Sequence, residues 1–127
     1  MKTIERLPEA ELEVMLTLWH NTPPLTVSEI TKLLEPAHSW KTATVHVLLE
    51  RLGERGFVAC DKSGFKHLFT PIITEEEYRR GEEKTFLKRF FGGSAKNMIA
   101  SLLNADGLTD DDLEEISAML KQRKGGK

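Results

Sequence analysis

The segment SWKTATVHVLLERLGERGFVACDKSGFKHLFTP, residues 39–71, decides the fold. Its first part predicts a helix that begins behind Ser39 or Thr42, because either hydroxyl can accept the free amides of a first helical turn. Gly56 follows this helix at the position where glycine commonly forms the C-terminal cap. One face of the helix is apolar at positions i, i+3, i+4 and i+7, which are Val45, Leu48, Leu49 and Leu52.

Two short strands are predicted after the helix. Residues 57–60 (FVAC) form an apolar strand, and residues 61–64 (DKSG) form a polar turn in which Gly64 is free to adopt a positive φ. Residues 65–70 (FKHLFT) form the second strand, which ends at Pro71 because proline cannot extend a central strand. A helix followed by a hairpin with lysines at its tip is typical of a winged helix. The alternative is a small α+β element with a solvated turn.

A helix-turn-helix arrangement is predicted before and within this segment. Pro8 opens a first helix, which ends near residue 20. Its predicted buried face is Leu12, Met15, Leu16 and Trp19. A second helix, residues 27–34, is capped by Thr26 or Ser28, and its predicted inward residues are Ile30, Leu33 and Leu34. Residues 25–26 are a candidate for a very short strand. Two helices and a turn before an exposed third helix form a helix-turn-helix.

The C-terminal half predicts three amphipathic helices. Thr74 with Glu77, Ser94, and Thr109 with Asp112 are placed as N-terminal caps, and glycines break the chain near residues 92 and 107. Such helices cannot all bury their apolar faces within one chain, so we expect a homodimer about a two-fold axis. Packing against the wing is the alternative. The predicted dimerisation residues are Phe86, Phe90, Met98, Ile99, Leu102, Leu103, Leu113, Ile116, Met119 and Leu120.

Several segments together carry a family resemblance: LPEAELEVMLTLW (7–19), LTVSEITKLL (25–34), SWKTATVHVLLERLGERGFV (39–58), HLFTPIIT (67–74), EEEYRRGEEKTFLKRFFGGSAKNMIASLL (75–103) and LTDDDLEEISAMLKQ (108–122). In their order and spacing they resemble the BlaI/MecI penicillinase repressors. The resemblance implies a mainly α fold with a small β wing, divided into a winged-helix DNA-binding domain (1–73) and a helical dimerisation domain (74–127). It also implies a dimeric repressor that binds palindromic double-stranded operator DNA. A copper-responsive branch of the same superfamily carries a pair of cysteines at its C-terminus. This chain lacks that motif, so the resemblance does not favour a copper-responsive regulator.

The predicted DNA-facing residues lie on the third helix and the hairpin: Lys41, Thr42, Thr44, His46, Val47, Arg51, Lys62, Ser63 and Lys66. Thr44 and Val47 are expected at base edges, where the Val47 methyl groups suit a thymine methyl. His46 is expected to donate to a base, and Arg51 to reach a phosphate or a guanine. Lys41 and Thr42 lie where phosphates bind a helix N-terminus, and the hairpin residues are expected at phosphates. Each basic residue taken alone reads as a solvated surface charge.

In the resembled family, a membrane sensor protease pathway leads to cleavage of the repressor in its dimerisation region. Matched by order, the resemblance implies a cleavage position within residues 99–103, and the bond between Ser101 and Leu102 is the expected site. The family pattern has Asn-Phe at this bond, so this chain departs from it. A plain dimer-core helix is the alternative at this position.

Composition narrows the remaining classes. The chain has 127 residues, a formal net charge of −2 and one cysteine, Cys60, which we expect to be a buried structural thiol in a reducing compartment. No apolar run is long enough to enter a membrane and no secretory signal precedes the first helix, so the expected location is the cytoplasm. The four histidines lack metal-ligand spacing, and no catalytic motif is present, so neither a metal, a cofactor nor an enzyme is expected. The functional alternative is a winged helix that binds protein instead of DNA.

Overall fold

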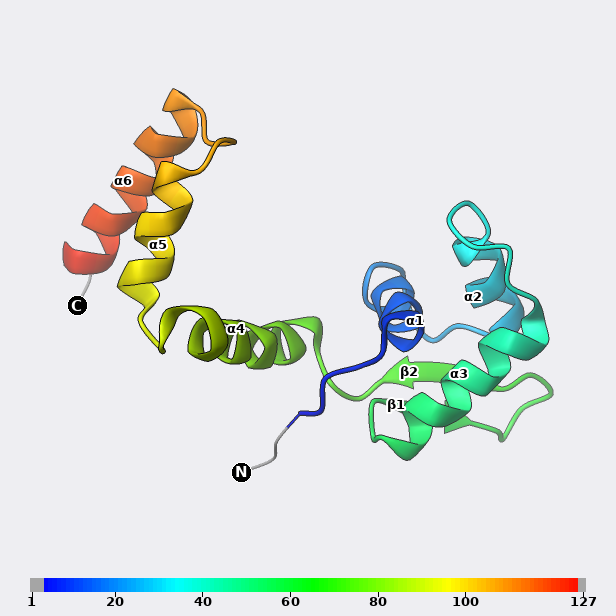
Figure 1. Cartoon of the computed structure of the whole chain (residues 1–127). Coiled ribbons are helices and arrows are strands. Elements are labelled where there is room, and N and C mark those ends of the chain that lie inside the picture. Colours follow the sequence, from blue (N-terminus) through cyan, green and yellow to red (C-terminus); the bar gives the residue numbers. More distant parts are fainter. Residues whose placement is uncertain (1–3, 126–127) are drawn as a thin grey trace. The chain divides into compact units, whose positions relative to one another are not determined.

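The computed structural model describes residues 4–125, which form six helices and two strands (Figure 1). They belong to two compact units that divide between Glu83 and Lys84. The division falls inside helix α4 (Glu75–Phe91), because its first turns belong to the first unit: Tyr78 is buried there and donates its backbone amide to Thr74. The functional division at residues 73/74 stays a prediction.

The first unit contains α1 (Glu9–Trp19), α2 (Val27–Leu34), α3 (Thr42–Glu54), β1 (Val58–Asp61) and β2 (Leu68–Pro71). The three helices pack on one another, and the antiparallel β1–β2 hairpin packs beside α3 and α1. Leu25 pairs with Phe69 as an isolated bridge, so the predicted short third strand exists as a single pair of residues. The predicted mainly α fold with a small β wing is therefore confirmed.

Helix α3 has its predicted buried face and its predicted glycine cap. Its four apolar side chains lie in the core. Gly56 has a φ of +83°, and the amides of Gly56 and Phe57 donate to the carbonyls of Gly53 and Leu52, which closes the helix end. The predicted N-terminal cap is wrong: Lys41 occupies the cap position, and no side chain accepts a first-turn amide there.

The buried face of α1 differs from the prediction. The buried residues are Glu11, Val14, Met15 and Leu18, whereas Leu12, Leu16 and Trp19 are only partly buried. The cause is Glu11, a carboxylate placed on the inner face, where it accepts from Nε of Arg55 at 2.7 Å. A hydrophobic pattern reads such a residue as outward-facing. Leu33 of α2, predicted to face inward, is also exposed.

Arg55 joins the end of α3 to α1 through charge. Its guanidinium contacts the exposed Glu5 at 2.9 Å as well as the buried Glu11, and its pKa is raised first by the hydrogen bond with Glu5 and further by the charge of Glu11. A buried carboxylate without a partner is unfavourable. The Arg55–Glu11 pair therefore fixes the C-terminal end of α3 against α1.

Replacing Arg55 by Met should lower the thermal midpoint of the first unit, because it leaves the Glu11 carboxylate buried and unpaired. The control Glu5→Ala removes only the exposed contact and should lower the midpoint by less. The double variant Glu11→Leu, Arg55→Met should recover most of the loss. These midpoints are measured by circular dichroism, and equal falls for Arg55→Met and Glu5→Ala would contradict the assignment.

The second unit consists of the end of α4, helix α5 (Ala95–Asn104) and helix α6 (Asp110–Gly125). The predicted caps are confirmed, since Ser94 accepts from the amide of Asn97, and Thr109 and Asp112 cap each other's amides. Gly92, Gly93 and Gly107 have positive φ at the breaks between helices. No residue of α5, and no described residue of α6, is buried in the single chain.

Candidate nucleic-acid interface

The outward face of α3 and the residue before it carry the predicted DNA-facing residues of this helix. All six of the predicted residues between positions 41 and 51 are exposed: Lys41, Thr42, Thr44, His46, Val47 and Arg51. Because four leucine and valine side chains hold the opposite face in the core, the backbone of α3 is fixed while this face stays free. Small and β-branched residues near its start let another surface approach the helix closely.

The N-terminus of α3 is open to an anion. No side chain accepts its first-turn amides, and its first turn has no acidic residue, whereas α2 and α5 are capped by Thr26 and Ser94. Free amides at the positive end of a helix bind phosphate favourably. Lys41 and Thr42 lie at this end and add a charge and a hydroxyl donor.

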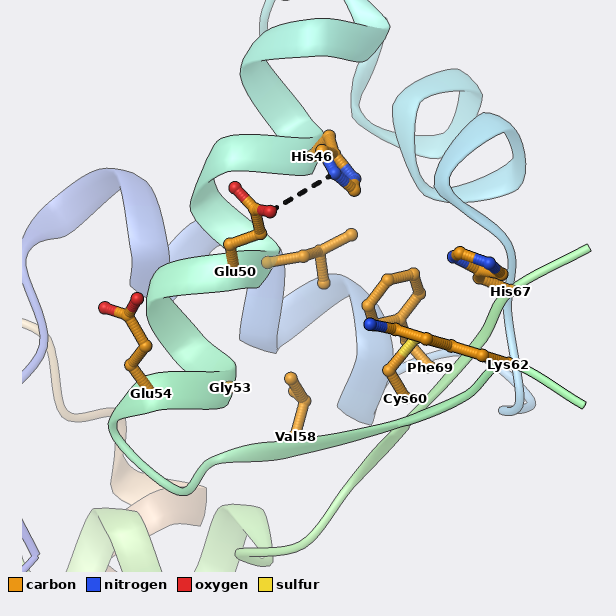
Figure 2. Close-up of a pocket in the computed structure, with 10 residues that line it drawn as sticks. His46, Glu50, Gly53, Glu54, Val58, Cys60, Lys62, His67 and Phe69 are labelled. Carbon is orange, nitrogen blue, oxygen red and sulfur yellow. Dashed lines mark ion pairs between the residues drawn. The ribbon is translucent and has the colours of Figure 1, made fainter.

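A groove of about 630 Å³ lies between α3 and the hairpin (Figure 2). The residues of α3 on its wall include His46, Glu50 and Glu54, and Nε2 of His46 lies 3.5 Å from a carboxylate oxygen of Glu50. The carboxylates of Glu50 and Glu54 are unfavourable near phosphates, and this contact pairs Glu50 with a residue of its own helix. The hairpin side of the groove is formed by Val58, Cys60, Lys62, His67 and Phe69.

Two predictions about the hairpin change with the structure. Cys60 is half-buried on the wall of this groove, whereas a buried structural thiol was expected. The second strand begins at Leu68 instead of residue 65, which leaves residues 62–67 as a loop, and Gly64 does not adopt a positive φ. The side chain of Asp61 organises the start of this loop: it accepts from the amide and hydroxyl of Ser63 at 2.9 and 2.6 Å, which lowers its pKa.

The wing residues predicted at phosphates, Lys62, Ser63 and Lys66, are all exposed in this loop. Sequence reasoning placed Phe65 in a strand, but the structure places it in the loop with its side chain fully exposed. The signal that it missed was local: Phe65 follows a serine and a glycine and precedes a lysine, which favours a loop. Among residues 4–125 no group of three or more metal-ligating side chains comes together.

The predicted dimerisation residues remain uncovered within the single chain. Phe86, Phe90, Ile99, Leu102, Leu103, Leu113, Met119 and Leu120 are exposed, and Met98 and Ile116 are half-buried. An apolar groove of about 380 Å³ between α5 and α6 is lined partly by Ile99, Leu103 and Leu120. Ser101, at the predicted cleavage bond, is exposed on α5.

Comparison with known proteins matches residues 7–122 to a family described as penicillinase repressor. The penicillinase repressor of Bacillus licheniformis is 31% identical over 127 residues, which cover 100% of this chain and 98% of that protein. Two solution structures are 33% identical and cover 61% of this chain and 94% of their own. They are the DNA-binding domain of the repressor BlaI, with a TM-score of 0.52, and monomeric Bacillus licheniformis BlaI in complex with the blaP half-operator, with a TM-score of 0.51. No helix within residues 4–125 is long and apolar enough to cross a membrane.

Proposed function

Because this chain belongs to the penicillinase repressor family, we propose that it is a DNA-binding transcriptional repressor that recognises a palindromic operator as a homodimer. The family resemblance predicted from the sequence is confirmed by the match over residues 7–122. The observation that carries the proposal is the free outward face of α3, with its uncapped N-terminus, beside an exposed wing that contains Lys62 and Lys66.

In the proposed complex α3 enters the major groove of double-stranded DNA. Thr44 and Val47 lie near the start of the helix and reach base edges, while the free amides beside Lys41 hold a phosphate. Arg51, one turn further along, reaches a guanine or the backbone. The loop of the wing reaches phosphates, which position the helix without reading sequence. Two copies then occupy half-sites about one helical turn apart.

Because the chain has no net positive charge, binding to DNA must depend on a local cluster of positive side chains. A formal net charge of −2 gives no overall attraction to DNA, so the positive groups must act where they are gathered. The exposed Lys41, Arg51, Lys62 and Lys66 supply four positive charges from α3 and the wing. Binding through such contacts weakens steeply as salt rises, because counterions released from the phosphates compete with them.

Lys41→Ala and Arg51→Ala should each weaken binding to the DNA upstream of the protein's own gene by about tenfold. Fluorescence anisotropy at two salt concentrations measures this against a scrambled duplex. Arg80→Ala is the matched control, because Arg80 is exposed on α4 and pairs with Glu76 away from α3. Wild-type affinity in both α3 variants would contradict the docking of this helix.

Homodimer formation is proposed from the apolar side chains of α4, α5 and α6, which the single chain leaves exposed. Derepression by cleavage between Ser101 and Leu102 is proposed from the resemblance, and a membrane sensor protease pathway would supply the signal. Helix α5 has no buried side chain within one chain, so it opens locally at a low free-energy cost when the dimer is apart. Loss of α6 and the end of α5 would weaken the dimer and with it the cooperative hold on two half-sites.

A winged helix that binds protein is the second candidate function. Glu50 and Glu54, exposed on the same helix as the proposed reading residues, favour a basic partner over a phosphate backbone. The same anisotropy titration separates the two functions. A folded, dimeric protein that binds neither the promoter nor the scrambled duplex at low salt supports the protein-binding function.

A further inference from the structure

Among the described residues of the first unit, Phe65 is the most exposed large apolar side chain, with 100% of its surface accessible. It lies in the loop of the wing between Gly64 and Lys66, and every residue from 62 to 67 is exposed, so no neighbour covers the ring. A phenylalanine left wholly in water forgoes the favourable free energy that burial of its ring would provide. The second phenylalanine of the hairpin, Phe69, is buried in the core instead.

The surroundings of Phe65 distinguish between the surfaces it could meet. A protein partner needs a contiguous apolar patch, but the residues beside the ring are Ser63, Gly64 and Lys66, with Lys62 at the base of the loop. The nearest acidic residue along the chain, Asp61, is engaged by the amide and hydroxyl of Ser63. A single ring flanked by two lysines matches DNA, which has negative phosphates outside and stacked apolar base faces inside.

The position of the loop points to the same occupant. Lys62 and His67, the two ends of the loop, line the groove across from His46 in the N-terminal half of α3 (Figure 2). The wing loop therefore extends from the part of the unit where α3 presents its open N-terminus. A surface that contacts the start of α3 is within reach of the loop.

We propose that Phe65 is a DNA-contacting wedge, whose ring enters the minor groove beside the half-site read by α3 and partly unstacks one base step. This inference rests on the proposed function and deepens it. Apolar side chains inserted in this way kink the duplex, and pyrimidine–purine steps are the easiest to open. Phe65 then adds affinity that does not depend on phosphate charge and favours a flexible step next to the half-site.

Phe65→Ala tests the wedge with the whole protein and a duplex of its own promoter region. We expect affinity to fall about tenfold with an unchanged slope of affinity against salt, whereas Lys66→Ala should lower that slope by about one. In duplexes carrying 2-aminopurine at one adenine at a time, wild-type protein should raise the fluorescence at one step beside each half-site, and Phe65→Ala should not. The control is Ile72→Ala, which removes another exposed apolar side chain (57% accessible) outside the loop and should bind as wild type does.

The outcomes separate the two claims. The wedge is overturned if Phe65→Ala binds the promoter with wild-type affinity. It is also overturned if the wild-type protein binds the promoter without a rise in fluorescence. Both outcomes leave the proposed repressor function in place. An equal loss in Phe65→Ala and Ile72→Ala also overturns the wedge, because the effect would then be one of apolar surface in general. Failure of the wild-type protein to bind the promoter removes the proposed function, and the wedge with it.

Discussion

Met119→Glu and Phe90→Glu should each convert the proposed homodimer to a monomer and weaken promoter binding by about a hundredfold. These side chains are 63% and 62% exposed in the single chain, on α6 and α4, so a charge costs little there unless a second copy covers it. In a dimer, each substitution would place two carboxylates, one per copy, against apolar surface without a partner. The loss of affinity follows because two half-sites bound separately forfeit the effective concentration that links them.

Sedimentation velocity gives the oligomeric state, and anisotropy with the promoter duplex gives the affinity. Ala118→Glu is the matched control: it adds the same charge to the adjacent, exposed position of α6, away from the predicted apolar face. Circular dichroism should show unchanged helix content in all three variants. If Met119→Glu and Phe90→Glu both remain dimeric with wild-type affinity, the dimer forms through another surface.

Phe57→Ala should destabilise the first unit by about 4 kcal/mol. The ring is 1% exposed at the junction of α3 and β1, and it meets the ring of Tyr78 edge-on with centroids 5.9 Å apart. Tyr78 is held in turn, because its hydroxyl accepts from the backbone amide of Leu7 at 3.0 Å. Burial raises the pKa of this hydroxyl. A cavity here should therefore loosen both the segment around Leu7 and the start of α4.

Chemical denaturation in urea measures this loss, which is a large share of the free energy of unfolding of a small domain. Phe65→Ala is the matched control, since the same atoms are removed from a side chain that touches nothing in the folded unit. Its free energy of unfolding should stay within about 0.5 kcal/mol of the wild-type value. A loss below about 1 kcal/mol in Phe57→Ala would show that the site collapses around the missing ring.

The sequence predicted correctly those features of the fold that depend on residues close together in the chain. The spacing of Val45, Leu48, Leu49 and Leu52 fixed the buried face of α3, and Thr74 and Thr109 form the caps that their spacing to Glu77 and Asp112 indicated. These features depend on residues within two helical turns of one another. Periodicity and capping therefore suffice to find them.

Two of the failures, on helix α1 and at Cys60, have long-range causes. The buried face of α1 was misplaced because Glu11 is stabilised by Arg55, a residue 44 positions away that no local pattern connects to it. Cys60 was expected inside because its neighbours are apolar, but the groove beside α3 leaves it half-exposed. The DNA-facing set was predicted from residue type, and all nine of its residues are exposed.

Tyr78 also bears on how such regulators exchange parts in evolution. Its ring completes the core of the first unit although it belongs to α4, the helix that continues into the second. A recombination that joined a new C-terminal half at residue 74 would remove Tyr78 and leave one side of Phe57 without its neighbour. A viable crossover must retain the first turns of α4 or bring an aromatic residue in the same register. The shortest segment that recombination can transfer as a folded unit therefore includes the first turns of α4 in addition to the winged helix.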